Sequence, residues 1–169
     1  MLLDMRKLAA RGTVVNGFIA VAELARIKSL LASDRGTVTA HCEFSTDEEG
    51  RALLTVRSSV TLDVACQRCL EATQIEVTTD SVLCVVTGED KIGTLPASME
   101  PLIIAEDPAN LWSVVEDELL LGLPIVSYHE AGACAELVEK YRVGPEPTDE
   151  RSTPSPFEVL QQLKSQNQE

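Results

Sequence analysis

The stretch "RALLTVRSSVTLDVACQRCLEATQIEVTTDSVLCVV" (51–86) decides the fold of this chain. Apolar and polar residues alternate over 56–64, and apolar residues recur over 75–86. Alternation with a period of two is typical of a strand with one buried face. Because only a short segment separates the two runs, we expect a strand–turn–strand hairpin with Cys66 and Cys69 at its turn.

Further strands are expected on both sides of this hairpin. The segment "TVTAHCEFS" (37–45) alternates in the same way, and the turn "DEEG" (47–50) joins it to the hairpin. A short apolar run at 102–105 predicts an edge strand. Strands that follow one another through short turns form an antiparallel arrangement most simply. We therefore predict an α+β fold: an antiparallel β-sheet or partly closed barrel with flanking helices and a C-terminal helical segment.

Helical spacing appears in three segments. In 12–36 a β-prone run gives way to a predicted helix with one apolar face, formed by Leu24, Ile27, Leu30 and Leu31. The clearest helix, within 107–124, can be capped by Asp107 or Asn110, and its apolar stripe contains Leu111, Val114, Val115, Glu118 and Leu119. We predict a single domain over 1–143 and a proline-bearing tail over 144–169, with a short amphipathic helix at 156–164.

Charge limits the function classes that this chain fits. Its 169 residues contain 27 acidic and 14 basic residues, for a formal net charge of −13. Nucleic-acid affinity comes largely from Lys and Arg at phosphates, so strong direct binding of DNA or RNA is disfavoured, as is an anionic membrane. No signal-peptide pattern or membrane-length apolar run is visible, and we expect a cytoplasmic protein with reduced thiols.

The CxxC pair predicts three alternative chemistries. Zinc takes four N or S ligands, and Cys66 and Cys69 would supply two, with His129 and Cys134 of "HEAGAC" (129–134) as the other two. A redox pair is disfavoured because no helix start or βαβ pattern surrounds it. The third interpretation is a reduced pair in a tight turn without metal.

Little in the sequence favours an enzyme. Phosphate-loop, nucleophile-elbow and dinucleotide fingerprints do not occur in the sequence. In "VEDE" (115–118) a solvated acidic face is the simpler interpretation of Glu116 and Asp117, whereas Glu118 falls on or near the apolar stripe. These carboxylates could bind a partner, and Glu118 could instead tether the core.

Three segments taken together resemble the YceD family, whose members are described as large ribosomal RNA subunit accumulation proteins. They are "CQRCLE" (66–71), "VEDELLLGLPIVSYHEAGAC" (115–134) and "SPFEVLQQLK" (155–164). The resemblance implies a non-enzymatic factor needed for synthesis, processing or accumulation of 23S ribosomal RNA. It also implies possible metal binding, although this chain has only His129 and Cys134 where some members have a more cysteine-rich segment.

Charge and resemblance together predict how such a factor would act. An acidic surface suits a basic ribosomal protein or an RNA-processing enzyme, so ribosomal RNA would be reached indirectly. The predicted partner-binding residues are Glu116, Asp117 and Glu118 on the helix and Phe157, Leu160 and Leu163 in the tail. The tail segment could instead cap the core. In the alternative, the CxxC hairpin binds RNA directly as a zinc-knuckle-like module, through Arg51, Arg57 and Arg68.

Overall fold

The computed structural model describes residues 1–104, 108–130, 132–134 and 138. The chain divides into two units, Met1–Ala135 and Glu136–Glu169. Nearly all of the described residues belong to the first unit. The predicted boundary after residue 143 and the tail helix at 156–164 lie outside the described residues.

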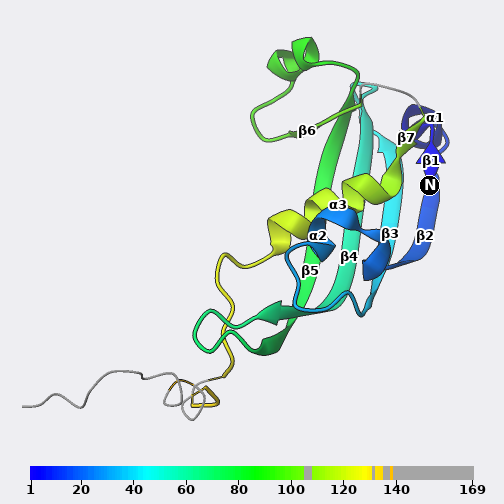
Figure 1. Ribbon diagram of the computed structural model, residues 1–169. Helices are drawn as coiled ribbons and strands as arrows, with labels where there is room; N and C mark the ends of the chain where they lie inside the picture. The colour runs from blue at the N-terminus through cyan, green and yellow to red at the C-terminus, as the bar shows by residue number, and fades with distance from the viewer. Residues whose placement is uncertain (105–107, 131, 135–137, 139–169) are drawn as a thin grey trace, which may run out of the picture. The chain divides into compact units, whose positions relative to one another are not determined.

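A five-stranded sheet in the order β2-β3-β4-β5-β6 forms the centre of the first unit (Figure 1). Its strands are β2 (Val14–Ala20), β3 (Thr37–Thr46), β4 (Ala52–Ala65), β5 (Ala72–Val86) and β6 (Glu100–Ile103). A second, two-stranded sheet pairs β1 (Leu2–Leu3) with β7 (Ala109–Asn110). The helices are α1 (Met5–Ala10), α2 (Ala25–Lys28) and α3 (Leu111–Gly122), with 3-10 turns η1 (Val21–Glu23) and η2 (Glu89–Thr94).

The predicted α+β class is confirmed, and the sheet is open. Strands β2 to β5 pair antiparallel through short connections, as expected. Strand β6 is the predicted edge strand, but it pairs parallel to β5. Parallel neighbours need a connection of about a dozen residues, and the segment 87–99, which includes η2, supplies it.

The β4–β5 hairpin is the longest pairing in the sheet. Its register runs from Leu53 opposite Cys84 to Ala65 opposite Ala72, so the CxxC segment forms the connection at the far end. Buried positions alternate along β4, as the sequence pattern predicts: Leu54, Val56, Ser58, Val60, Leu62 and Val64. The hairpin therefore carries both the core face of the sheet and the turn with the cysteines.

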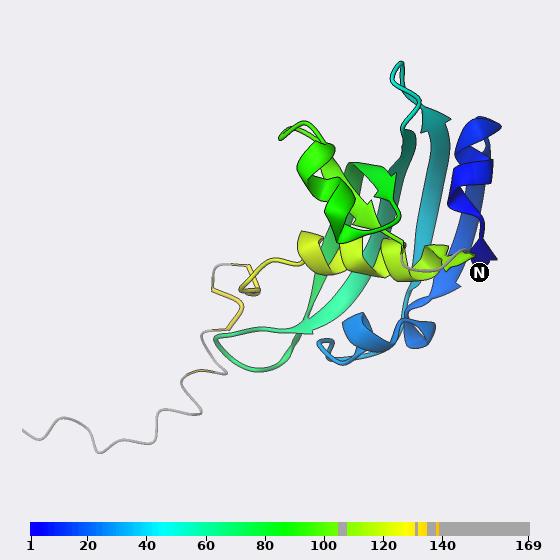
Figure 2. The same cartoon turned by 90° about the horizontal axis from the view of Figure 1, so that it is seen from above.

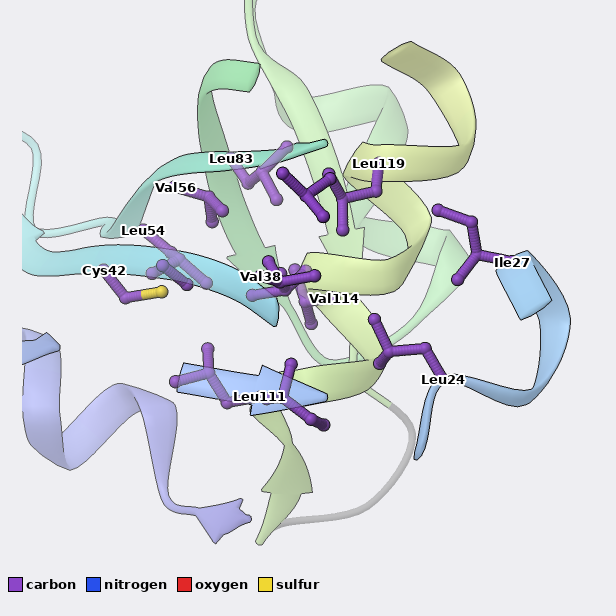
Figure 3. Close-up of a cluster of buried hydrophobic side chains, with 14 of the residues drawn as sticks. Leu24, Ile27, Val38, Cys42, Leu54, Val56, Leu83, Leu111, Val114 and Leu119 are labelled. Carbon is purple, nitrogen blue, oxygen red and sulfur yellow. The ribbon is translucent and has the colours of Figure 1, made fainter. Parts of the chain in front are cut away.

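Helix α3 packs across one face of the sheet (Figures 1 and 2). Asn110 caps it by accepting a hydrogen bond from the Trp112 N–H at 3.2 Å. Its apolar stripe meets side chains of β3, β4, β5 and the α2 region (Figure 3), with Leu111, Val114, Val115 and Leu119 buried. A fully buried side chain of this size contributes about 1.5–3 kcal/mol. The predicted stripe is thus the main contact that covers the sheet.

The helix predicted within 12–36 is much shorter than its apolar spacing suggested. Leu24 and Ile27 are buried as expected, but α2 has only four residues and Leu30 is exposed. The N–H groups of Ser29 and Leu30 bond three residues back, which tightens the last turn and ends the helix. Four apolar residues at helical spacing therefore did not suffice to extend it.

A buried carboxylate holds α2 against α3. Glu116 Oε1 accepts hydrogen bonds from the backbone N–H groups of Arg26 at 2.8 Å and Ile27 at 3.1 Å. The Arg26 guanidinium also pairs with Glu116 Oε2 at 3.3 Å and with Asp117 Oδ1 at 2.5 Å. Glu116 is 7% exposed, so its expected place on a solvated acidic face is wrong. The N–H groups at the start of a helix lack intrahelical partners, and this carboxylate satisfies two of them.

Replacing Glu116 tests this tertiary cap. We expect Glu116→Ala to lower the free energy of unfolding by about 2–3 kcal/mol, because two buried N–H groups and a guanidinium lose their acceptor. Glu116→Gln, which keeps one oxygen acceptor, should cost less. Asp117→Ala removes a half-exposed ion pair and should cost less than about 1 kcal/mol. Urea unfolding measures all three, and equal losses for Glu116→Ala and Asp117→Ala would contradict the cap.

Candidate metal centre

The connection between β4 and β5 is a tight turn that buries two sulfur atoms. The Cys66 N–H donates to the Glu71 carbonyl, and the Leu70 N–H donates to the Cys66 carbonyl, both at 2.9 Å. Leu70 has a φ of 64°, in the left-handed region that residues other than glycine rarely adopt. Cys66 and Cys69 are 0% and 3% exposed although turn residues normally face water. Something other than solvent must therefore occupy the surroundings of these thiols.

The segment that follows α3 fills that space. Pro124 lies just beyond the helix, and the chain then runs to the hairpin turn (Figure 1, yellow). The Gln67 N–H donates to the Ser127 carbonyl at 2.9 Å. The Arg68 guanidinium carbon lies 5.2 Å from the centre of the Tyr128 ring, within range of a cation–π contact. These contacts fix the segment beside the turn.

The four side chains predicted as metal ligands converge at this place. The ligand atoms of Cys66, Cys69, His129 and Cys134 all lie within 4.8 Å of one another. Cys66 Sγ is 3.6 Å from Cys134 Sγ. His129 Nδ1 is 3.4 Å from the Sγ atoms of both Cys69 and Cys134. Zinc bond lengths in a tetrahedron imply about 3.8 Å between two sulfur ligands and about 3.6 Å between sulfur and nitrogen.

A backbone carbonyl sets the tautomer of His129. Its Nε2 lies 3.0 Å from the Ala72 carbonyl oxygen, which can only accept, so Nε2 carries the proton. In this tautomer of the neutral ring the Nδ1 lone pair is available as a ligand, and Nδ1 lies beside the sulfur atoms of Cys69 and Cys134. A histidine that binds a metal usually donates its other ring N–H to a carbonyl or carboxylate in this way.

The protein environment favours a thiolate at Cys66. Burial raises the pKa of this thiol, but the N–H groups of Cys69, His129 and Arg68 and the His129 side chain outweigh it and lower the pKa to about 5. Burial and hydrogen bonds to Cys66 and Cys69 raise the pKa of Cys134 to about 11. Without a cation, three thiolates in contact would repel one another, and a bound cation would favour the thiolate form of each.

Geometry favours metal binding over redox chemistry. A lowered thiol pKa is also expected of a redox cysteine, but such a thiol is partly exposed, whereas Cys66 is fully buried in a turn between strands. Four protein ligands with no open position are typical of a structural site. The Cys3His cluster can therefore hold a metal ion that joins the hairpin turn to the segment after α3. Cys42 and Cys84 are also buried, but they lie outside the cluster.

The predicted partner-binding residues occupy different environments. Glu118 is 7% exposed and accepts a hydrogen bond from the Ser81 hydroxyl, while Glu116 is engaged with α2. Asp117 is half exposed. Partner binding by this trio stays a prediction, and all three carboxylates already have partners inside the domain. Phe157, Leu160 and Leu163 lie outside the described residues.

The three arginines named for direct RNA binding are not brought together. Arg51 pairs with Asp47 at the start of β4, Arg57 pairs with Asp80 along the strand, and Arg68 lies at the turn. Strand β4 has 14 residues, which span about 45 Å at 3.3 Å per residue. These arginines therefore do not form a single basic patch.

Several groups that build the site gave no signal in the sequence. The Ala72 carbonyl, the Ser127 carbonyl and the left-handed backbone of Leu70 act through the main chain, so residue type does not reveal them. A glycine at position 70 would have indicated the turn geometry, but leucine conceals it.

The strained residue in the turn provides a test of this geometry. Leu70 is 77% exposed, so little packing is lost when it is replaced. In Leu70→Gly the relief of about 1–2 kcal/mol of strain should match or exceed the entropy cost of about 0.5–1 kcal/mol. The β-branched Leu70→Val should be less stable than the glycine variant by about 1 kcal/mol or more. Urea unfolding measures the stability of both variants. A Leu70→Gly variant that is less stable than Leu70→Val would contradict the left-handed backbone at residue 70.

Comparison with known proteins identifies the family. A sequence model of the family described as "Large ribosomal RNA subunit accumulation protein YceD" matches residues 54–164. A protein of that name from Haemophilus influenzae (strain ATCC 51907 / DSM 11121 / KW20 / Rd) is 27% identical over 163 residues, which cover 96% of this chain and 94% of that relative. No solved structure matches. The matched region contains the hairpin, α3 and all four ligands of the cluster, and the chain belongs to the YceD family.

Proposed function

We propose that this protein is a non-enzymatic factor in ribosome biogenesis that supports the accumulation of large-subunit ribosomal RNA in the cytoplasm. The description of its family and the name of its relative from Haemophilus influenzae support this role. The similarity extends over almost the full length of both chains, so the proposal concerns the whole protein. None of the helices in the described part of the chain is long and apolar enough to cross a membrane.

The Cys3His cluster is proposed to hold structural zinc. The observation that carries this assignment is the convergence of Cys66, Cys69, His129 and Cys134, with spacings close to those around a tetrahedral zinc ion. Zinc would join two segments that are about 60 residues apart in the sequence and would stabilise the hairpin turn. A site closed by four protein ligands supports a structural role for this centre.

A basic protein partner fits the charges of this molecule better than a long stretch of RNA. The formal net charge is −13, and Arg51, Arg57 and Arg26 are paired with carboxylates of the same domain. A long phosphate backbone would meet arginines whose charge these carboxylates already balance. An acidic surface would instead accelerate encounter with a basic ribosomal protein or an RNA-processing enzyme. Direct RNA binding through the hairpin turn is the alternative, and affinity purification with and without ribonuclease distinguishes the two.

Zinc content and chelation test the metal assignment. Protein purified without a histidine tag under reducing conditions should contain one zinc per chain. A chelator should lower the free energy of unfolding by about 2.7 kcal/mol or more, the linkage expected when free zinc exceeds its Kd a hundredfold. Cys134→Ser should lose the metal, whereas Cys84→Ala, at a buried thiol outside the cluster, should keep it. Substoichiometric zinc whose removal leaves stability unchanged would refute the assignment.

Affinity purification tests the role of a protein partner. The tagged full-length chain should retain a basic ribosomal protein or an RNA-processing enzyme from lysate, and ribonuclease should not release it. Raising the salt concentration should weaken the interaction, because it depends on opposite charges. If ribonuclease removes everything that is bound, RNA is the ligand and the adaptor role is wrong.

A further inference from the structure

A cavity lies at the end of the sheet opposite to the cysteine cluster. Its volume is about 430 Å³, and it is formed by α1, the β3–β4 connection, the end of β5 and η2. The cavity and the cluster are at opposite ends of β4, a strand of 14 residues. Small-molecule sites usually have volumes of about 300–1,000 Å³, so the cavity is large enough for more than a single ion.

Basic side chains are concentrated in the lining of this cavity, although the protein as a whole is acidic. Arg6, Arg51 and Lys91 line it, and none of the described residues in its lining is Asp or Glu. The carboxylates that pair with Arg51 and Lys91 lie next to this lining. Acidic residues outnumber basic ones by 27 to 14 in the chain, so three basic side chains in one lining exceed what the average composition would produce. Three hydroxyl groups, those of Thr46, Thr87 and Thr94, belong to the same lining.

Neighbouring carboxylates hold Arg51 in place and leave part of it for a ligand. Its Nε donates to Asp47 Oδ2 at 2.6 Å, and its Nη2 donates to Glu49 Oε2 at 2.7 Å. The Nη1 group takes part in neither contact. Lys91 forms a longer pair with Asp90, at 3.6 Å. Because a ligand gains most from groups that are already ordered, a fixed guanidinium is a favourable anion contact.

These groups together match an organic phosphate. Guanidinium and ammonium groups donate to phosphate oxygens in strong contacts, because both partners are charged. Of the three hydroxyl groups, those of Thr46 and Thr94 already donate to the carbonyls of Ala9 and Lys91, so that of Thr87 is the one that can donate to a ligand. Apolar side chains, including Val85 and Leu95, form another part of the lining and would suit the flat face of a base. We propose that this cavity binds the phosphate and base of one nucleotide, either free or at the 5′-phosphorylated end of an RNA strand. This site is independent of the metal centre and of the protein partner proposed above.

Calorimetric titration of the full-length protein with AMP tests this site, with adenosine as the ligand that lacks a phosphate. We expect AMP to bind and adenosine to bind at least tenfold more weakly, because the charged hydrogen bonds are lost. Lys91→Gln and Arg6→Gln should each weaken AMP binding about tenfold by the same reasoning. Both substitutions avoid Arg51, whose ion pairs contribute to the β3–β4 turn.

Lys28→Gln is the matched control. Lys28 is similarly exposed and is also paired with a neighbouring aspartate, Asp34, but it lies on α2 outside the cavity. This variant should bind AMP like the unaltered protein. No binding at millimolar AMP, equal binding of adenosine, or an equal loss in Lys28→Gln would overturn the proposal.

A second titration separates the two sources of the nucleotide. Short RNA with a 5′-phosphate is compared with the same RNA carrying a 5′-hydroxyl. Tighter binding of the phosphorylated RNA than of AMP supports an RNA end as the ligand, and binding of AMP alone supports a free nucleotide. Equal binding of the two RNAs, unaffected by Lys91→Gln, would show that RNA binds elsewhere and would exclude this cavity as its site.

Discussion

The pairing of β4 with β5 is the constraint on which the rest of this structure depends. It extends from Leu53 opposite Cys84 to Ala65 opposite Ala72. A shift of one residue would turn the apolar positions of one strand to the wrong face and would remove them from contact with α3. The same register places the CxxC turn at one end of the sheet and the cationic cavity at the other. The positions of the core, the cysteine cluster and the cavity therefore all depend on the register between β4 and β5.

The cysteine cluster brings together two segments of the domain that are about 60 residues apart in the sequence. Helix α3 covers the sheet, and the segment beyond it returns to the hairpin turn, where His129 and Cys134 meet Cys66 and Cys69. Bringing the four side chains together costs loop-closure entropy, and the free energy of binding a metal ion would offset this cost. A metal ion at this cluster would therefore stabilise the segment after α3.

Much of this architecture could be predicted from local patterns. The alternation in β3, β4 and β5 and the apolar stripe of α3 are visible in the sequence, and the structure confirms these strands and this helix. The four candidate metal ligands are also visible in the sequence, and the structure places them in one cluster. The short α2, the parallel β6 and the buried Glu116 were not predicted, because each depends on tertiary contacts. The cavity draws its lining from α1, β3, β4, β5 and η2, and no local motif could reveal it. The tail helix and its apolar residues lie outside the described residues.

X-ray absorption spectroscopy at the zinc edge of the purified full-length protein tests the proposed coordination of zinc by Cys66, Cys69, His129 and Cys134 most directly. The predicted spectrum has three sulfur atoms at about 2.3 Å and one nitrogen at about 2.0 Å from zinc. His129→Ala should replace the nitrogen contribution with that of an oxygen or leave it absent, while the sulfur distances persist. A spectrum with only oxygen and nitrogen neighbours, or protein without zinc, would contradict the account.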